Sequence, residues 1–203
     1  DGNFQLFLKD GTELISTAAA PQGSQEKGFD LQLSLQADEK LYGLGDESRE
    51  SLNKRGHANL MSVTNVVSYT PIPFFSSNKG WGLYLNSTWM HHFDGGKEQS
   101  DILRMHSDKG LLECFLFACG SIPETLKRYS ELSGQSYVLP RWSYGLTFVC
   151  DEREVRARDV LYEAYEFRRQ NIPCDVIGLE PSWMEKTYDF STEKKWSEER
   201  FHI

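Results

Sequence analysis

Short runs in which apolar and polar residues alternate follow one another from the amino terminus to about Cys119. The clearest of them, residues 29–35, alternates at every position, as expected of a strand with one buried face. The Asp10-Gly11 pair between two runs is typical of a hairpin turn. Many short strands separated by such turns predict an antiparallel sandwich or barrel. The expected strands are residues 4–9, 13–16, 29–35, 60–67, 72–76, 81–85 and 111–118.

The pattern changes to a helical one at residues 122–133, where apolar side chains recur near every third or fourth position. Ser121 is the expected N-cap, and Glu124 is placed to complete a capping box. Gly134 is placed to end the helix. We expect this helix to close the β domain, so that residues 1–140 form one domain.

Beyond residue 140 the sequence predicts a strand, a helix and a second strand. Residues 141–149 are strand-like, and a helix capped by Asp151 and Glu154 is expected to run to about Gln170. The apolar residues 174–179 follow as a second strand, which completes one βαβ unit. Because a parallel pair needs further strands and cover on both faces, we interpret the chain as the front portion of a longer protein.

The second of these strands leads directly to a carboxylate. Glu180 follows the apolar run, and Pro181 cannot continue the ladder as a donor, so the chain is expected to leave the sheet there. A carboxylate at the carboxyl end of a parallel strand lies on the face where ligands bind. The alternative is that Glu180 faces solvent or pairs with a nearby arginine.

Composition limits the classes of function. With 39% hydrophobic and 13% aromatic residues the chain can bury a core, so disorder is not expected. Its 203 residues carry 22 Lys and Arg against 30 Asp and Glu, a net charge of −8. This charge disfavours nucleic acid and anionic membrane as partners and is compatible with a neutral ligand such as a sugar. The sequence has no signal-like start and leaves the compartment open.

No metal or cofactor site is expected. His91 and His92 are adjacent, and neighbours on a strand point to opposite faces, so we do not expect them to share a metal. The cysteines show no zinc-type spacing and are interpreted as buried thiols rather than disulfides. They are Cys114, Cys119, Cys150 and Cys174.

Several motifs, in order, resemble glycoside hydrolase family 31. The resemblance covers its amino-terminal β-sandwich and the junction into its (β/α)8 barrel. Each motif alone is weak, and the ordered set carries the resemblance. The motifs are YGLGDE at 42–47, LNKRG at 52–56, IPFF at 72–75, GWGLYL at 80–85, LKRYSELSG at 126–134, LPRWSYG at 139–145, and the segment from the second barrel strand to WM at 183–184 and YDF at 188–190.

The resemblance implies a mainly β chain. Residues 1–140 would form a galactose-mutarotase-like antiparallel sandwich, and residues 141–203 would be the first βαβ segment of a truncated (β/α)8 barrel. It also implies a retaining α-glycoside hydrolase that acts on terminal α-linked sugars. In the family both catalytic aspartates come from later barrel strands, so this chain would contain no catalytic residue and would be inactive alone. Its expected partners are a carbohydrate substrate and the remainder of the barrel.

The resemblance also implies substrate-binding positions. Glu180 stands where the family usually has an aspartate that binds sugar hydroxyls, and Asn65 stands where a sandwich loop carries another aspartate. Both differ from the family pattern, which leads to the hypothesis of a galacto-configured or N-acetylated sugar rather than plain glucose. Trp183 could stack on a sugar or pack beneath its loop, and Phe148 could line the pocket or fill the core.

A second class of function stays open at this point. The sandwich could be a carbohydrate-binding or purely structural module without catalytic activity. A binding module predicts measurable sugar binding by residues 1–140 alone.

Overall fold

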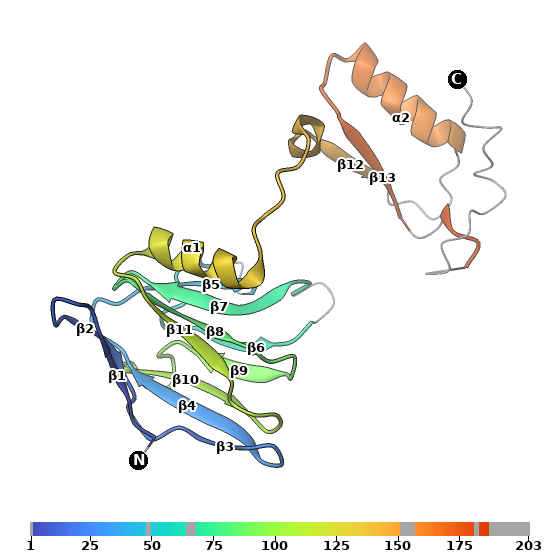
Figure 1. Ribbon diagram of the computed structural model, residues 1–203. Coiled ribbons are helices and arrows are strands. Elements are labelled where there is room, and N and C mark those ends of the chain that lie inside the picture. The colour runs from blue at the N-terminus through green and yellow to red at the C-terminus, as the bar shows by residue number, and fades with distance from the viewer. Residues whose placement is uncertain (1, 48–49, 64–67, 151–156, 181–182, 187–203) are drawn as a thin grey trace. The chain divides into compact units, whose positions relative to one another are not determined.

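The computed structural model describes residues 2–47, 50–63, 68–150, 157–180 and 183–186 (Figure 1). The chain divides into two compact units, residues 1–135 and residues 136–203. We call them the sandwich unit and the barrel unit.

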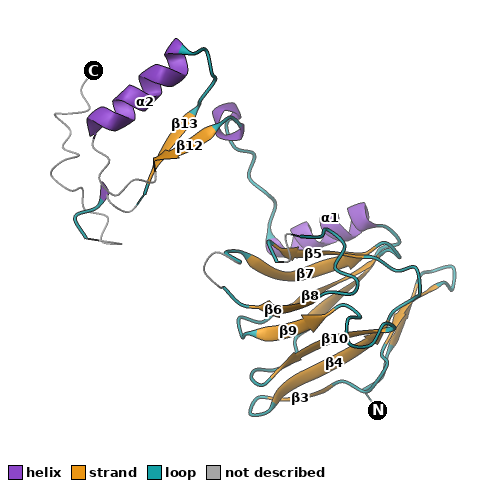
Figure 2. Ribbon diagram, turned by 180° about the vertical axis from the view of Figure 1, so that it is seen from behind, coloured by secondary structure: helices purple, strands orange, loops and turns teal. Residues whose placement is uncertain are grey.

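The sandwich unit consists of two antiparallel sheets and a small hairpin (Figures 1 and 2). One sheet has the strand order β3-β4-β10-β9-β6, and the other has the order β11-β8-β7-β5. The hairpin pairs β1 with β2. The strands are β1 (Gln5–Phe7), β2 (Glu13–Ser16), β3 (Gln22–Ser24), β4 (Gly28–Ser34), β5 (Leu41–Gly45), β6 (Ala58–Met61), β7 (Pro71–Ser77), β8 (Trp81–Leu85), β9 (His91–Asp94), β10 (Ile102–Ser107) and β11 (Cys114–Ala118).

The predicted mainly β architecture is confirmed, with differences in individual strands. The strands at 13–16 and 81–85 have the predicted bounds. The strand expected at 60–67 instead covers Ala58–Met61, and residues 64–67 lie outside the described residues. The prediction omitted four strands because they are short, glycine-containing or rich in polar residues. These are β3, β5, β9 and β10.

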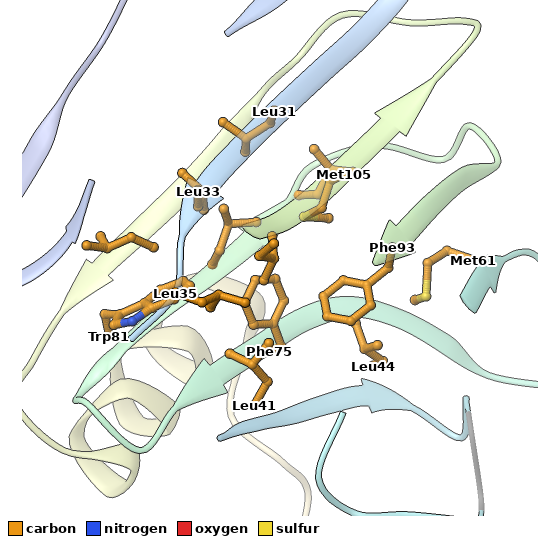
Figure 3. Packing of buried hydrophobic residues seen from close by; sticks show 14 of the residues in the cluster. Leu31, Leu33, Leu35, Leu41, Leu44, Met61, Phe75, Trp81, Phe93 and Met105 are labelled. Carbon is orange, nitrogen blue, oxygen red and sulfur yellow. The ribbon is translucent and has the colours of Figure 1, made fainter. Parts of the chain in front are cut away.

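The core between the two sheets centres on three aromatic rings. Phe75 on β7 makes an edge-to-face contact with Trp81 on β8, with ring centres 5.6 Å apart. It makes another with Phe93 on β9 of the opposite sheet, at 5.2 Å (Figure 3). Edge-to-face pairs bring the positive ring edge to the negative ring face, which adds to the stabilisation from burial alone. Phe75 therefore joins the two sheets.

A buried carboxylate lies beside this aromatic core. Glu39 is 2% exposed, and its carboxylate accepts hydrogen bonds from Trp81 Nε1 at 2.6 Å, from the Ser77 hydroxyl and from the Gln36 amide at 2.9 Å. A buried acidic side chain is costly unless donors surround it. Here one carboxylate satisfies donors from two strands and from its own loop, so it ties three segments together.

The helix α1 (Ile122–Ser133) has the predicted bounds. Ser121 Oγ accepts a hydrogen bond from the Glu124 amide, and Gly134 ends the helix with a positive φ of 103°, both as predicted. The Glu124 carboxylate lies near the side chains of Lys127 and Arg128 rather than completing a capping box.

One face of α1 lies on the four-stranded sheet. Tyr129 stacks on Phe74 of β7 with ring centres 3.9 Å apart. Thr125 is fully buried over Gly82 of β8, where an added Cβ would lie 2.5 Å from the threonine methyl. Position 82 therefore has no room for a side chain because the helix occupies that space.

The barrel unit contains a parallel pair of strands and one helix. The strand β12 (Thr147–Cys150) pairs in parallel with β13 (Val176–Leu179), and α2 (Ala157–Arg169) connects them in sequence. This confirms the predicted strand–helix–strand order. Asp151 and Glu154, the expected caps of the helix, lie outside the described residues. Neither helix in the described part of the chain has the length and apolarity that crossing a bilayer requires.

The prediction of one strand over residues 141–149 is wrong in its first half. Residues Arg141–Tyr144 form a short 3-10 helix, η1, after Pro140. The Ser143 amide bonds the Pro140 carbonyl at 2.9 Å, and the Gly145 amide bonds the Trp142 carbonyl at 3.1 Å. The aromatic residues that favoured a strand are instead held in these i→i+3 turns.

The helix α2 ends at Arg169, one residue before the predicted end. Asn171 has a left-handed φ of 56°, and the Ile172 amide bonds the Phe167 carbonyl at 2.9 Å. This is the Schellman arrangement, which satisfies a helix carbonyl that has no partner within the helix. The chain is thereby turned back toward β13.

Replacing Glu39 by alanine should strongly destabilise the sandwich unit. Trp81 Nε1 and the Ser77 hydroxyl would stay buried without an acceptor, at a cost of about 1–3 kcal/mol for each group. Glu39→Gln keeps one acceptor oxygen and should fall between the two, while Glu13→Ala, at an exposed position on β2, should change little. Urea unfolding monitored by tryptophan fluorescence measures the difference. A Glu39→Ala protein as stable as the Glu13→Ala protein would contradict the role given to this carboxylate.

Acidification should also destabilise the sandwich unit through His91. The ring is 3% exposed, burial lowers the pKa of His91 below its ordinary 6.5, and its Nδ1 bonds the Trp89 carbonyl at 3.0 Å. Because the unfolded chain then binds the proton more readily, stability is greatest above pH 6.5 and falls as the pH drops through that value. One such proton contributes at most about 1.4 kcal/mol per pH unit.

Melting temperatures measured between about pH 7.5 and 5.5, across the ordinary titration range of histidine, test this expectation. The decrease should be smaller in His91→Asn, whose amide can still donate to the Trp89 carbonyl. His57→Asn, in the loop before β6, is the matched control. Equal decreases in the wild-type and His91→Asn proteins would show that another group controls the acid sensitivity.

Candidate functional site

The parallel pairing of β12 with β13 places two strand ends at one edge. Cys150 and Leu179 are register partners at the carboxyl ends of the two strands. Glu180 is the next residue after Leu179, and its side chain is half-buried. The carboxyl edge of parallel strands is where ligands bind in α/β folds, so Glu180 lies in a position suited to binding.

A backbone hydrogen bond joins Trp183 to Glu180. The Trp183 amide donates to the Glu180 carbonyl at 3.2 Å. Trp183 is half-buried and Met184 after it is buried. Two of the predicted site residues, Glu180 and Trp183, are thus joined through their backbones.

Glu180 is available to a ligand as far as the described residues show. No lysine or arginine among them forms an ion pair with its carboxylate. The alternative in which Glu180 pairs with a nearby arginine therefore has no support in the described part of the chain. Two carboxylate oxygens accept hydrogen bonds in several directions, which suits a ligand that carries neighbouring hydroxyl groups.

Phe148 lies on the helix side of the strand pair. Its ring contacts Phe167 of α2 edge to face, with ring centres 5.2 Å apart. Val149, the next residue on β12, lies on the opposite face of the strand pair, beside Gly178. Its side chain is 46% exposed. The contact with Phe167 is the one expected if Phe148 fills the core.

Asn65 lies outside the described residues, so the structure does not relate it to Glu180. The adjacent acidic pair after β5 is described in part. The Asp46 carboxylate accepts hydrogen bonds from the Ser68 hydroxyl and from the amides of Tyr69 and Thr70, each at 2.9 Å. Asp46 therefore caps the loop that leads into β7.

Neither histidines nor cysteines form a metal site in the described part of the chain. No group of three or more His, Cys, Asp or Glu side chains gathers there in a way that could hold an ion. On β9 His91 is buried and His92 is exposed, which confirms that the two rings point to opposite faces. Cys114 is half-buried, and burial raises the pKa of its thiol.

Trp89, which belongs to none of the predicted strands or motifs, is exposed on the loop between β8 and β9. The available signal was an aromatic residue directly after the polar turn residues Asn86, Ser87 and Thr88. Aromatic residues are common in strands, so the signal alone does not separate an exposed ring from a buried one.

Each of the two units matches a domain of a known protein family. The glycosyl hydrolase 31 N-terminal galactose mutarotase-like domain matches residues 1–94. The glycosyl hydrolases family 31 TIM-barrel domain matches residues 136–202. The two matches occur in the order expected for one protein of this family.

Characterised relatives match the same stretch of chain. An alpha-xylosidase from Emericella nidulans is 27% identical over 175 residues, covering 82% of this chain and 22% of that protein. The alpha-xylosidase XylQ of Lactiplantibacillus pentosus is 27% identical over 178 residues, covering 84% and 23%. An isomaltosyltransferase from Sporosarcina globispora is 26% identical over 165 residues, covering 75% and 15%. The chain therefore spans less than a quarter of each of these relatives.

Solved structures agree with this assignment. A Flavobacterium johnsoniae GH31 dextranase complexed with isomaltotriose superposes with a TM-score of 0.83 at 27% identity, covering 95% of this chain and 24% of that chain. A family 31 alpha-glucosidase from Bacteroides thetaiotaomicron shares the fold, with a TM-score of 0.68 at 21% identity over 82% of this chain and 30% of that one. From its two domain matches, its relatives and its fold, the chain belongs to glycoside hydrolase family 31.

Proposed function

We propose that this chain is the front portion of a retaining α-glycoside hydrolase that removes terminal α-linked sugars. The observation that carries the proposal is the place of Glu180. It follows directly after the second of two parallel strands, within the segment that matches the family's TIM-barrel domain. A carboxylate at that edge that pairs with no lysine or arginine among the described residues is suited to hold a hydroxylated substrate.

The chemistry requires two carboxyl groups about 5–5.5 Å apart, one to attack the anomeric carbon and one to protonate the leaving oxygen. The family resemblance assigns both to aspartates on later barrel strands. We infer that they are supplied outside these 203 residues, and that the 203-residue chain alone does not hydrolyse glycosides. The part of the site present here binds and orients the sugar.

Glu180 is proposed to accept hydrogen bonds from sugar hydroxyls next to the scissile bond. Hydrogen bonds to a charged acceptor are shorter and stronger than those between neutral groups. The Glu180 side chain is half-buried, so part of its hydration is already lost before a ligand arrives. The hydrogen bond from the Trp183 amide to the Glu180 carbonyl supports the position of its backbone.

The identity of the sugar is the finer part of the proposal. The family usually has an aspartate at this position, and the extra methylene of Glu180 moves the acceptor oxygens by more than hydrogen-bond geometry tolerates without a compensating shift. This supports a galacto-configured or N-acetylated sugar. The relatives are named as alpha-xylosidases and an isomaltosyltransferase, so xylosides and glucosides are the competing substrates.

An activity screen of the full-length parent protein tests this function. Aryl α-glycosides of glucose, galactose, xylose and N-acetylgalactosamine are compared, with the 203-residue chain assayed in parallel. We expect cleavage by the parent, no cleavage by the chain, and the highest kcat/KM for a galacto-configured substrate. A parent that hydrolyses the α-glucoside or the α-xyloside fastest would overturn the choice of sugar and leave the reaction class intact. A parent inactive on the whole panel would favour the non-catalytic module.

Substitutions at Glu180 test its role in binding. Glu180→Ala in the parent should lower kcat/KM about 10- to 100-fold, the equivalent of about 1.5–3 kcal/mol for hydrogen bonds to a charged group. Glu180→Gln keeps one acceptor and should lose less. Glu185→Ala, at an exposed position in the same loop, is the matched control. If Glu180→Ala retains the kcat/KM of the control, Glu180 does not contact the substrate.

A further inference from the structure

Trp89 is an exposed aromatic residue that its surroundings hold in one place. The side chain is 52% exposed on the loop between β8 and β9. Its amide donates to Ser87 Oγ at 3.1 Å, and its carbonyl accepts the bond from His91 Nδ1 at 3.0 Å. Both ends of this residue's backbone are therefore bonded, so the loop presents the indole in a defined orientation.

The ring itself is supported from the loop between β10 and β11. At Gly110, which has a positive φ of 82°, an added Cβ would lie 2.4 Å from the indole ring. Lys109 Nζ lies 5.6 Å from the ring centre, within the range of a cation–π contact. A half-exposed indole held by a glycine and a lysine loses little freedom when a ligand stacks on it.

Hollows lie on two sides of Trp89. One, of about 540 Å³, is lined by Gln25, Asn86, Thr88 and Glu113 among others. The second, of about 300 Å³, is lined by residues that include His92 and Asp108. Trp89 and Lys109 line both hollows, so the two hollows are neighbours at this residue pair.

A third hollow continues the second. It has a volume of about 430 Å³ and shares Ser107 and Asp108 with its neighbour. Its remaining wall comes from β3, β4 and β10, and Gly28 of β4 lies directly against the Ser107 carbonyl. The β3–β4 turn and the loop after β10 lie side by side at one end of the sandwich unit in both ribbon views (Figures 1 and 2). The three linked hollows form one groove, which we call the Trp89 groove.

The lining of the Trp89 groove indicates what it can hold. Among the described residues it has three basic and four acidic side chains, and two of these, Arg104 and Asp30, already pair with each other. This near balance of charge disfavours a polyanion or a polycation. Amide, hydroxyl and imidazole groups beside the indole supply both donors and acceptors.

We propose that the Trp89 groove binds a neutral polysaccharide chain. The carbon face of a sugar ring is apolar and can stack on the indole, while its hydroxyls bond to the polar walls. The volume of each hollow lies in the lower half of the range found for small-molecule pockets. Three such hollows in series suit successive rings of a sugar chain rather than one isolated sugar. The groove retains the polymer and does not cleave it.

This inference goes beyond the proposed hydrolase function, because it concerns binding by residues 22–113 of the sandwich unit alone. Binding at Trp89 and cleavage of aryl glycosides are measured separately. A negative result for polymer binding therefore does not contradict the proposed hydrolase function, and a negative result for cleavage does not contradict polymer binding.

Affinity electrophoresis tests the proposal with the 203-residue protein. Native gels containing dextran, soluble starch or xyloglucan are compared with a gel without polymer and with one containing heparin. We expect at least one neutral polymer to retard the protein and heparin to leave its mobility unchanged. Trp89→Ala should weaken binding at least 10-fold, and Trp89→Phe, which keeps a smaller ring, should weaken it less.

Two further variants make the test specific. Trp142→Ala removes a tryptophan of similar exposure, 56%, from the barrel unit and should bind like the wild-type protein. Thr88→Arg leaves Trp89 in place and fills the adjoining hollow from an exposed position, so it should also weaken binding. The proposal fails if no neutral polymer retards the protein, if Trp89→Ala and Thr88→Arg bind normally, or if Trp142→Ala loses as much affinity as Trp89→Ala.

Discussion

The contact of Phe75 with the rings of Trp81 and Phe93 is the interaction on which the sandwich unit depends. It joins the two sheets at their centre, and the buried Glu39 carboxylate fixes the adjacent tryptophan by its indole nitrogen. A close-packed core allows little relative movement of the strands that form it. The loops at the ends of the sheets, including the one that carries Trp89, are therefore supported by a rigid base.

The barrel unit follows a different constraint. Its two strands are parallel, so their carboxyl ends meet at one edge, and the helix between them covers the face that carries Phe148. The opposite face, represented by Val149, has no cover among the described residues. In a complete barrel that face would contact side chains from other strands, since barrel interiors are filled. The two paired strands β12 and β13 are sufficient to form the edge at which Glu180 lies. The position of Glu180 at that edge therefore does not depend on the other strands of a barrel.

The sequence predicts the elements whose patterns are local. Alternation predicted β4 to within one residue at each end, and a capping serine with a terminal glycine defined both ends of α1. The prediction from sequence failed at η1, where aromatic residues suggested a strand although Pro140 initiates a 3-10 turn. It also omitted β9, since a four-residue strand containing two histidines and an aspartate has too few apolar positions to show a period.

The candidate sites were predictable to different degrees for the same reason. Glu180 could be placed because it directly follows the strand that positions it. The Trp89 groove could not be predicted in this way. Its walls come from β3, β4, the loop before β9 and the loop after β10, which meet only in the folded sheet. Phe148 carried two alternatives in sequence because a strand residue gives no indication of which layer it faces, whereas its contact with Phe167 places it on the helix side.

The close fit of Thr125 against Gly82 has a consequence for the order in which the protein is made. All eleven strands of the sandwich unit precede α1 in the chain, so they leave the ribosome first. Until the helix follows, the outer face of the four-stranded sheet, with Phe74 at its surface, lacks the stacking of Tyr129. During synthesis this face is a transient apolar surface of the kind that chaperones bind, and the arrival of one twelve-residue helix covers it.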